Sequence, residues 1–156
     1  MNTVTSKDGT TIAFDRYGEG PAIVPVGGAF QHRAIDPSTA HLAELLAPQF
    51  TVYHYDRRGR GGSGDTAPYA VEREIEDIDA LIQEAGGSAF AFGMSSGAVL
   101  ALEAAAHGLA ITKLALYEPP FFVDDSRPPL PADYLERLTD LLANDRRGDA
   151  VELFMT

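Results

Sequence analysis

The fold is decided by one short stretch of the sequence, residues 89–100, which read AFAFGMSSGAVL. Its first four residues form an apolar run typical of a buried β-strand, and the Ala- and Leu-rich segment Ser96 to Ala106 is typical of a helix. Gly93 and Gly97 lie on either side of the junction, where a side chain would strike the adjoining strand or helix. The pattern therefore predicts a strand, a sharp turn with Ser95 at its tip, and a helix.

The same alternation of strand and helix continues on both sides of this stretch. Strands are predicted over Thr10 to Tyr17, Ala22 to Val26, Phe50 to Tyr55 and Ile111 to Tyr117, and helices over Thr39 to Leu46 and Val71 to Ala85. In the last of these helices the apolar residues share one face and the acidic residues are expected off it. Turn residues from Gly18 to Pro21 predict a hairpin-like start. The alternation predicts an α/β fold with a doubly wound, mainly parallel sheet.

The composition of the sequence changes after Tyr117. Five prolines lie within residues 118–131, which indicates an excursion from the sheet. An amphipathic helix is predicted from Tyr134 to Leu142, and a second helix is predicted to begin at Asp149 with a capping-box-like pattern. No helix stop signal precedes Thr156, so we expect the sequence to be cut inside a helix.

Composition limits the classes of function. The 156 residues are 45% hydrophobic and 22% charged, which is typical of one soluble globular domain that needs no metal or disulfide staple. The absence of Cys excludes a cysteine nucleophile and thiolate metal sites. A net charge of −11 argues against nucleic acids and anionic membranes as partners. The polar N-terminus lacks the apolar region of a signal peptide and no run is long enough to span a membrane, so we expect a cytoplasmic protein.

Residues Gly93 to Gly97 also fit the pattern G-x-S-x-G between a predicted strand and a predicted helix. That context is typical of a nucleophile elbow, a strained turn that exposes the Oγ of Ser95 above the sheet. The helix that begins at Ser96 directs its unsatisfied N–H groups at the turn, and these favour a developing oxyanion. The alternative is a tight glycine and serine turn with no chemical role.

Three segments together resemble the N-terminal half of an α/β-hydrolase-fold enzyme. They are Val24 to Phe30, which resembles a strand and oxyanion loop, Asp56 to Gly64, which resembles the loop after the next strand, and Gly93 to Gly97. Their order and spacing match over about residues 8–123. One departure is Gly27, where many members carry His.

The resemblance implies a division of the chain and a set of site residues. Residues 1–123 would form the N-terminal part of an α/β-hydrolase core, and residues 124–156 the start of a helical cap or lid that is incomplete. Ser95 would be the nucleophile, and the backbone N–H groups of Ala29 and Ser96 would form the oxyanion hole, with Gly28 as the near alternative to Ala29. No cofactor and no metal are implied.

The rest of a catalytic triad is not found in the sequence. The family order is Ser, then an acid, then His, yet three of the four histidines precede Ser95: His32, His41 and His54. His107 closes its predicted helix and is expected to be a C-terminal cap. His32 stays a spatial alternative because it follows the oxyanion loop. Glu118 is expected to be a structural or site-lining carboxylate, with a catalytic role as the alternative.

Two other readings of the glycine- and arginine-rich loop carry less weight. Residues 59–64 fit G-x-G-x-x-G, but no helix opens directly after them, which argues against dinucleotide binding. Arg57, Arg58 and Arg60 could form an anion site, but pairing with acidic residues of this acidic chain is the better prediction.

The leading hypothesis is a serine hydrolase that acts on a small ester, thioester or amide-like substrate through an acyl-enzyme at Ser95. The competing hypothesis is a truncated or degenerate unit of the same fold that serves in binding or assembly, and the fold also hosts peroxidases and lyases. Because the triad His is missing, we expect the 156-residue chain alone to be inactive. We also expect it to self-associate, or to pair with a missing C-terminal half, through the exposed edge of the strand Ile111 to Tyr117.

Overall fold

The computed structural model describes residues 1–124 and 129–155. They belong to two compact units, Met1–Pro120 and Phe121–Thr156. Residues 125–128, which fall within the predicted proline-rich excursion, and residue 156, at the end of the predicted cap, lie outside the described part.

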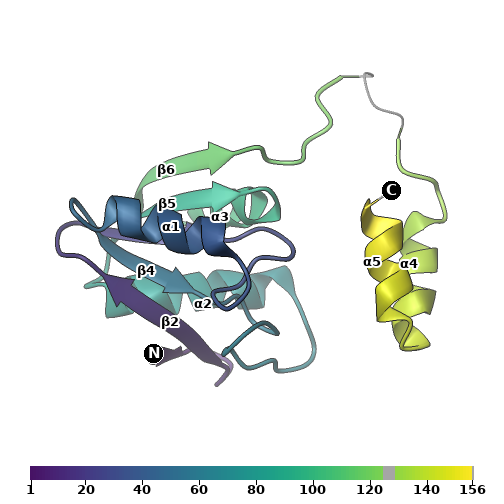
Figure 1. Cartoon of the computed structure of the whole chain (residues 1–156), viewed down its shortest axis with the longest axis horizontal. Coiled ribbons are helices and arrows are strands. Elements are labelled where there is room, and N and C mark those ends of the chain that lie inside the picture. Colours follow the sequence, from purple (N-terminus) through teal and green to yellow (C-terminus); the bar gives the residue numbers. More distant parts are fainter. Residues whose placement is uncertain (125–128, 156) are drawn as a thin grey trace. The chain divides into compact units, whose positions relative to one another are not determined.

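The first unit is built on a six-stranded sheet with the order β1-β2-β4-β3-β5-β6 (Figure 1). The strands are β1 (Asn2–Thr5), β2 (Thr11–Tyr17), β3 (Ala22–Val26), β4 (Thr51–Tyr55), β5 (Ala89–Met94) and β6 (Ile111–Tyr117). The neighbours from β4 to β6 pair in parallel, whereas β1 pairs with β2, and β2 with β4, antiparallel. The predicted mainly parallel sheet is therefore confirmed.

The start of the chain differs from the prediction in one respect. The hairpin is formed by β1 and β2, with Thr5 opposite Thr11, and not across Gly18 to Pro21. Those turn residues lead from β2 to β3, and β4 lies between these two strands in the sheet. Strand β1 was not predicted, because its four residues are mostly polar and exposed at the edge of the sheet.

Helices cover both faces of the sheet, as the doubly wound prediction requires. They are α1 (Pro37–Leu46), α2 (Val71–Glu84) and α3 (Ser96–Ala106). Because successive strand residues point to opposite faces, Ile23 of β3 packs in a cluster with Ala43 of α1, while Val24 lies in the larger cluster that includes Ile78 of α2 and Ala101 of α3. The two clusters form the core of this unit on either side of β3.

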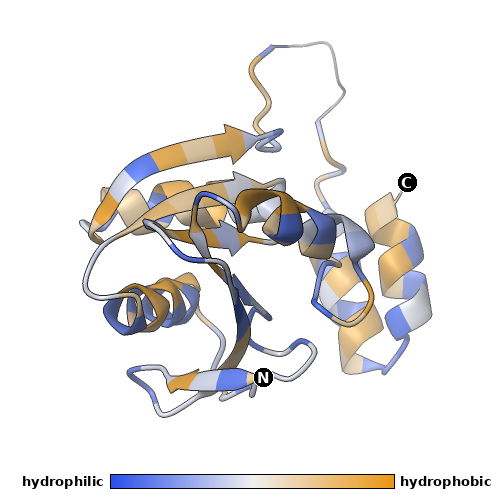
Figure 2. Cartoon of the chain, turned by 60° about the vertical axis from the view of Figure 1, so that its left-hand side comes forward, coloured by the Kyte–Doolittle hydropathy of each residue, from blue (hydrophilic) through white to orange (hydrophobic). Residues whose placement is uncertain are grey.

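Strand β6 lies at one edge of the sheet, where it pairs with β5 and with no other strand of the described residues. It is mostly apolar along its length (Figure 2). Ile111 and Leu114 pack partly against the larger core cluster, but Leu116 and Tyr117 are exposed. The exposed edge predicted for this strand is therefore present, and its consequence for association stays a prediction.

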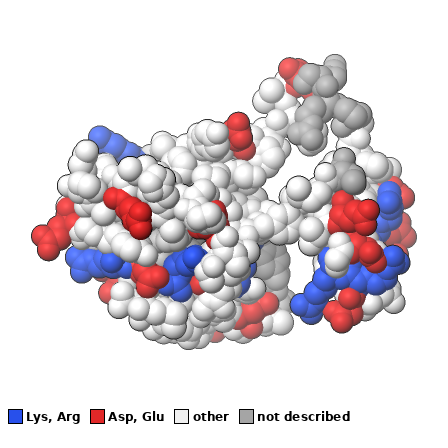
Figure 3. Space-filling view, viewed as in Figure 1, with Lys and Arg blue, Asp and Glu red and all other residues white. Residues whose placement is uncertain are grey.

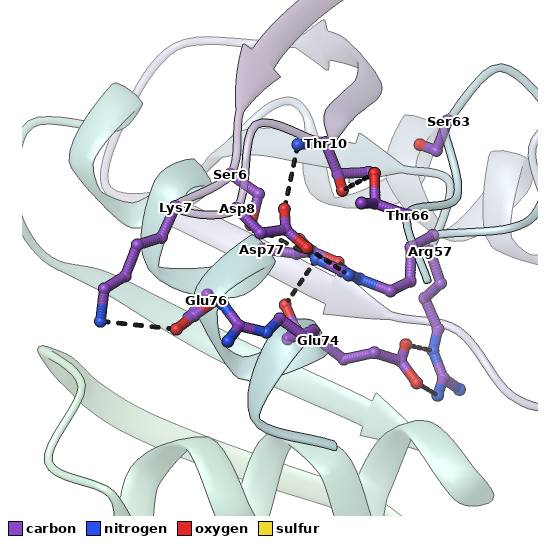
Figure 4. Close-up of polar contacts among 12 residues, drawn as sticks. Ser6, Lys7, Asp8, Thr10, Arg57, Ser63, Thr66, Glu74, Glu76 and Asp77 are labelled. Carbon is purple, nitrogen blue, oxygen red and sulfur yellow. Dashed lines mark hydrogen bonds and ion pairs between the residues drawn. The ribbon is translucent and has the colours of Figure 1, made fainter. Parts of the chain in front are cut away.

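The loop after β4 is held by buried ion pairs between arginines and α2 (Figure 4). Arg58 donates from Nε and Nη2 to the Asp77 carboxylate at 2.8 and 2.7 Å, and from Nη1 to Asp8 at 2.8 Å. The Arg58 and Asp77 side chains are each 1% exposed. Arg57 makes a bidentate pair with Glu74, both distances being 2.6 Å. Internal pairing is thereby confirmed for these two arginines.

The second unit is a pair of helices, α4 (Tyr134–Ala143) and α5 (Arg147–Met155). The prediction that the last helix begins at Asp149 is wrong. Asp149 lies in the first turn of α5, where its carboxylate accepts from Arg146 Nε at 2.5 Å. A negative charge in a first turn is favoured by the helix dipole, which explains why the residue resembles a start signal.

Basic and acidic side chains lie next to one another on the face of each unit shown in Figure 3, without a continuous basic patch there. Within the described residues, none of the helices combines the length and the apolar character that crossing a membrane would need.

We predict that Arg58→Met destabilises the first unit by about 3–5 kcal/mol, because it leaves the carboxylate of Asp77 buried without its partner. The measurement is urea unfolding at neutral pH. Arg73→Met is the matched control, since the Arg73 side chain is 40% exposed and pairs with Glu76, three residues along α2. The control is expected to lose less than about 1 kcal/mol. Equal losses in the two variants would contradict the prediction.

The same variant has a predicted pH signature. Hydrogen bonds from Arg58 and then from Thr10 lower the pKa of Asp8 below its ordinary value. A lowered carboxyl pKa adds stability above the pKa of the unfolded chain, near ~4, and this stability is lost as pH falls through the folded value. As the pH falls below the pKa of the unfolded carboxyl group, Arg58→Met should therefore lose less stability than the wild type.

Candidate active site

The turn between β5 and α3 has the strained geometry expected of Ser95. Its φ is 53° and its ψ is −123°, a conformation that residues with a side chain rarely adopt. Backbone hydrogen bonds hold it: Ser95 N–H donates to the Tyr117 carbonyl of β6 at 2.9 Å, and the Ser95 carbonyl accepts from Ala98 N–H at 2.9 Å and from Val99 N–H at 3.4 Å. The sheet and the helix together impose the strain.

The glycines that flank Ser95 are required by close backbone approaches. A Cβ at Gly93 would lie 2.5 Å from the Cα of Ala98. A Cβ at Gly97 would overlap the carbonyl oxygens of Val26 and Gly27, at the end of β3. Since the obstructing atoms are backbone, no side-chain movement could relieve either contact. The two glycines therefore leave room for a close backbone approach, as the sequence pattern predicted.

The loop after β3 runs beside Ser95. A Cβ at Gly28 would lie 3.4 Å from the Cβ of Ser95. The Gly28 N–H donates to Oε1 of Gln31 at 2.5 Å, so it is already occupied. Within residues 1–124 and 129–155, the N–H of Ala29 has no hydrogen-bond partner, and neither does that of Ser96 in the first turn of α3. Of the two donors considered for this loop, Ala29 is the one whose N–H is free.

Arg57 links this loop to the start of α3. Its Nη1 donates to the Gly27 carbonyl at 3.1 Å and to the Oγ of Ser96 at 3.2 Å. Burial opposes the charge on Arg57 and on its partner Glu74, but their mutual hydrogen bonds lower the pKa of Glu74 and raise that of Arg57. Both groups therefore stay ionised, and the guanidinium is fixed against the two segments that carry the candidate oxyanion donors.

None of the four histidines, all of which lie in the described part, is hydrogen-bonded to Ser95. His107 Nδ1–H donates to the Glu103 carbonyl at 2.8 Å, which confirms its role at the C-terminal end of α3. His54 is buried against Thr39 of α1, and burial lowers its pKa. His32 borders a small recess together with His54, and its buried Nδ1 has no hydrogen-bond partner among the described residues.

Two other polar residues, Glu118 and Gln31, lie near the turn. Glu118 is exposed, has a φ of 48°, and directly follows the Tyr117 carbonyl that holds Ser95. Gln31 was missed by the sequence reasoning, although it binds Gly28 N–H through Oε1 and Met94 Sδ through Nε2. Among the described residues, no group of three or more His, Asp or Glu side chains could hold a metal ion.

Comparison with known proteins places these features in a family. A family model described as "Alpha/beta hydrolase family" matches residues 23–155. A solved structure of an alpha/beta hydrolase from Sphaerobacter thermophilus DSM 20745 is 66% identical with a TM-score of 0.94, over 99% of this chain and 59% of that one. The uncharacterized hydrolase YraK of Bacillus subtilis (strain 168) is 34% identical over 99 residues, which are 61% of this chain and 35% of the relative.

A more distant solved structure shows the fold alone. An esterase from Exiguobacterium antarcticum is 23% identical with a TM-score of 0.75, over 98% of this chain and 59% of that one. This chain therefore spans between about a third and three fifths of the length of the proteins it matches.

We predict that Gly97→Ala costs about 1–3 kcal/mol in the free energy of unfolding, because its methyl group would push α3 away from the end of β3. Urea unfolding measures the loss. Gly64→Ala is the control in the same unit, since a Cβ there meets no atom closer than 3.4 Å and its φ is not positive. The control should stay within about 0.5 kcal/mol of the wild type. A Gly97→Ala protein as stable as Gly64→Ala would show that the approach is not tight.

Proposed function

Because this chain belongs to the alpha/beta hydrolase family, we propose that it carries the nucleophile and the oxyanion hole of a serine hydrolase. The substrate class is a small ester, thioester or amide-like molecule, cleaved through an acyl-enzyme at Ser95. One observation carries the proposal: Ser95 holds a φ of 53° at the tip of the β5–α3 turn, next to Gly28 of the loop after β3, and the N–H groups of Ala29 and Ser96 have no partner among the described residues. Such strain persists only where the surroundings impose it, and it clusters at functional sites.

The proposed reaction follows from these groups. The Oγ of Ser95 attacks the substrate carbonyl carbon as a histidine accepts its proton, and the carbonyl oxygen becomes an oxyanion. The N–H groups of Ala29 and Ser96 donate to that oxyanion, the second assisted by the positive end of the α3 dipole. The tetrahedral intermediate then expels the leaving group, which takes up the proton. Water releases the acyl group by the same steps, and no cofactor takes part.

Among the described residues, none of the four histidines is hydrogen-bonded to Ser95, so none of them is proposed as the base. Loss of a triad base lowers turnover by up to about 10⁶-fold, so the segment alone is proposed to be inactive. The lack of a histidine partner also favours the second candidate function, a unit of the same fold that binds without turnover. Covalent labelling of the protein at its natural length separates the two.

We predict that a fluorophosphonate probe labels Ser95 in the protein at its natural length. The wild type should be labelled and Ser95→Ala should not, because the adduct forms only on an activated hydroxyl. Ser88→Ala is the matched control, since Ser88 is an exposed serine that precedes β5, and it should label like the wild type. Labelling that persists in Ser95→Ala or is found on Ser96 would sink the assignment, and no labelling of the wild type would favour the binding function.

We further predict the geometry of the adduct. In a crystal structure of the phosphonylated protein, one phosphoryl oxygen should lie about 3 Å from the backbone nitrogens of both Ala29 and Ser96. An oxygen that points to solvent, or that binds Gly28 N after displacing Gln31, would contradict the proposed oxyanion hole.

A further inference from the structure

Arg60 differs from its two neighbouring arginines in its partner. Arg57 and Arg58 each donate to carboxylates, but within the described chain Arg60 has no carboxylate within ion-pair distance. Its Nη1 instead donates to the carbonyl of Gly28 at 2.7 Å. Burial, and then the nearby charge of Arg57, lower the pKa of Arg60. Burying this guanidinium against a peptide oxygen therefore costs free energy, and no ion pair among the described residues accounts for its position.

The bond that Arg60 makes has a direct consequence for Ala29. The Gly28 carbonyl and the Ala29 N–H belong to the same peptide unit, which is planar and, between these residues, trans. In such a unit the C=O and the N–H point in opposite directions. A donor that fixes the direction of the Gly28 oxygen therefore fixes the direction of the Ala29 N–H.

This peptide needs such a restraint. It follows two glycines, Gly27 and Gly28, and glycine allows more backbone conformations than any other residue. The backbone contact to the Gly28 carbonyl, from Gln31 N–H, is 3.4 Å long and therefore weak. The bond from Arg60 is 0.7 Å shorter than this contact and is charge-assisted, so it is the stronger restraint.

Side chains of three residues, Arg57, Gln31 and Arg60, hold successive backbone groups of this loop. Arg57 binds the Gly27 carbonyl, Gln31 binds the Gly28 N–H, and Arg60 binds the Gly28 carbonyl. The next group along the chain is the Ala29 N–H, which has no partner in the part of the chain that the structure describes. The loop is thus restrained up to the donor that the reaction would use.

We propose that Arg60 is a positioning residue that orients the N–H of Ala29 toward the oxyanion by holding the Gly28 carbonyl. The catalytic consequence rests on the proposed function of Ser95. The guanidinium also polarises the peptide it binds, because hydrogen bonds in a chain strengthen one another. The Ala29 N–H becomes a better donor as negative charge develops on the substrate oxygen.

The test compares Arg60→Met, which removes the donor, with Arg60→Lys, which keeps one. Arg16→Met is the control, an identical change at an exposed arginine of β2. All are made in the protein at its natural length, and melting temperatures identify any variant that fails to fold. With a p-nitrophenyl ester, we expect Arg60→Met to lower kcat at least about 10-fold with little change in KM, because the complete loss of an oxyanion donor costs about 10²–10³-fold. Arg60→Lys should recover part of this loss, and Arg16→Met should match the wild type.

A second readout does not depend on activity. In protein labelled with ¹⁵N-alanine, the residual dipolar coupling of the Ala29 N–H reports the direction of that bond. We expect it to change in Arg60→Met, to return in Arg60→Lys, and to stay the same in Arg16→Met. If it changes as expected while the wild type shows no Ser95-dependent turnover, the positioning role of Arg60 is supported and the hydrolase function is refuted.

Two results would overturn the proposal. One is an Ala29 coupling that Arg60→Met leaves unchanged. The other is a rise in KM confined to anionic esters, with kcat unaltered, because Arg60 would then bind the substrate and not the peptide.

Discussion

One close approach of two backbones underlies the site, where α3 at Gly97 meets the end of β3. The carbonyl groups of Val26 and Gly27 fill the space that a side chain at position 97 would need. Small residues on the buried face of α3, Ala98, Ala101 and Ala104, let the helix lie this near the sheet, and all three are completely buried. The approach brings a loop from early in the chain against a turn some 70 residues later. Without it, the loop that carries Gly28 would not lie against Ser95.

Buried ion pairs between the loop after β4 and α2 then stabilise this arrangement. Glu74 and Asp77 are three residues apart on α2, so they share a face and receive Arg57 and Arg58 respectively. Burying these charges is costly unless each is paired and hydrogen-bonded, and here every carboxylate meets a guanidinium in a bidentate manner. The helix thereby aligns a loop that contacts Gly27 and Gly28.

Much of the fold was predictable from the sequence, and the errors have physical causes. The strand Ile111–Tyr117 and the helix from Ser96 were predicted with their observed ends, because apolar runs and glycine stops are local signals. The expectation that acidic residues lie off the buried face of α2 is wrong for Glu74 and Asp77, since their partners come from a distant loop. The positions of Ser95 and its glycines could be inferred from the motif. The contacts of Gln31 and Arg60 could not, because they bind peptide groups whose directions only the folded loop defines.

The bond from Ser95 N–H to the Tyr117 carbonyl has a consequence for the order in which the site is completed. A nascent chain emerges from the ribosome with its N-terminus first, so Ser95 emerges before β6, the strand that supplies this acceptor. Until β6 is added to the sheet, part of what enforces the unfavourable backbone angles at Ser95 is missing, and the serine can relax to an ordinary conformation. The strained geometry of Ser95 is therefore completed late in synthesis. A nascent chain that ends before Tyr117 contains the whole motif but lacks one of the bonds that hold the serine in place.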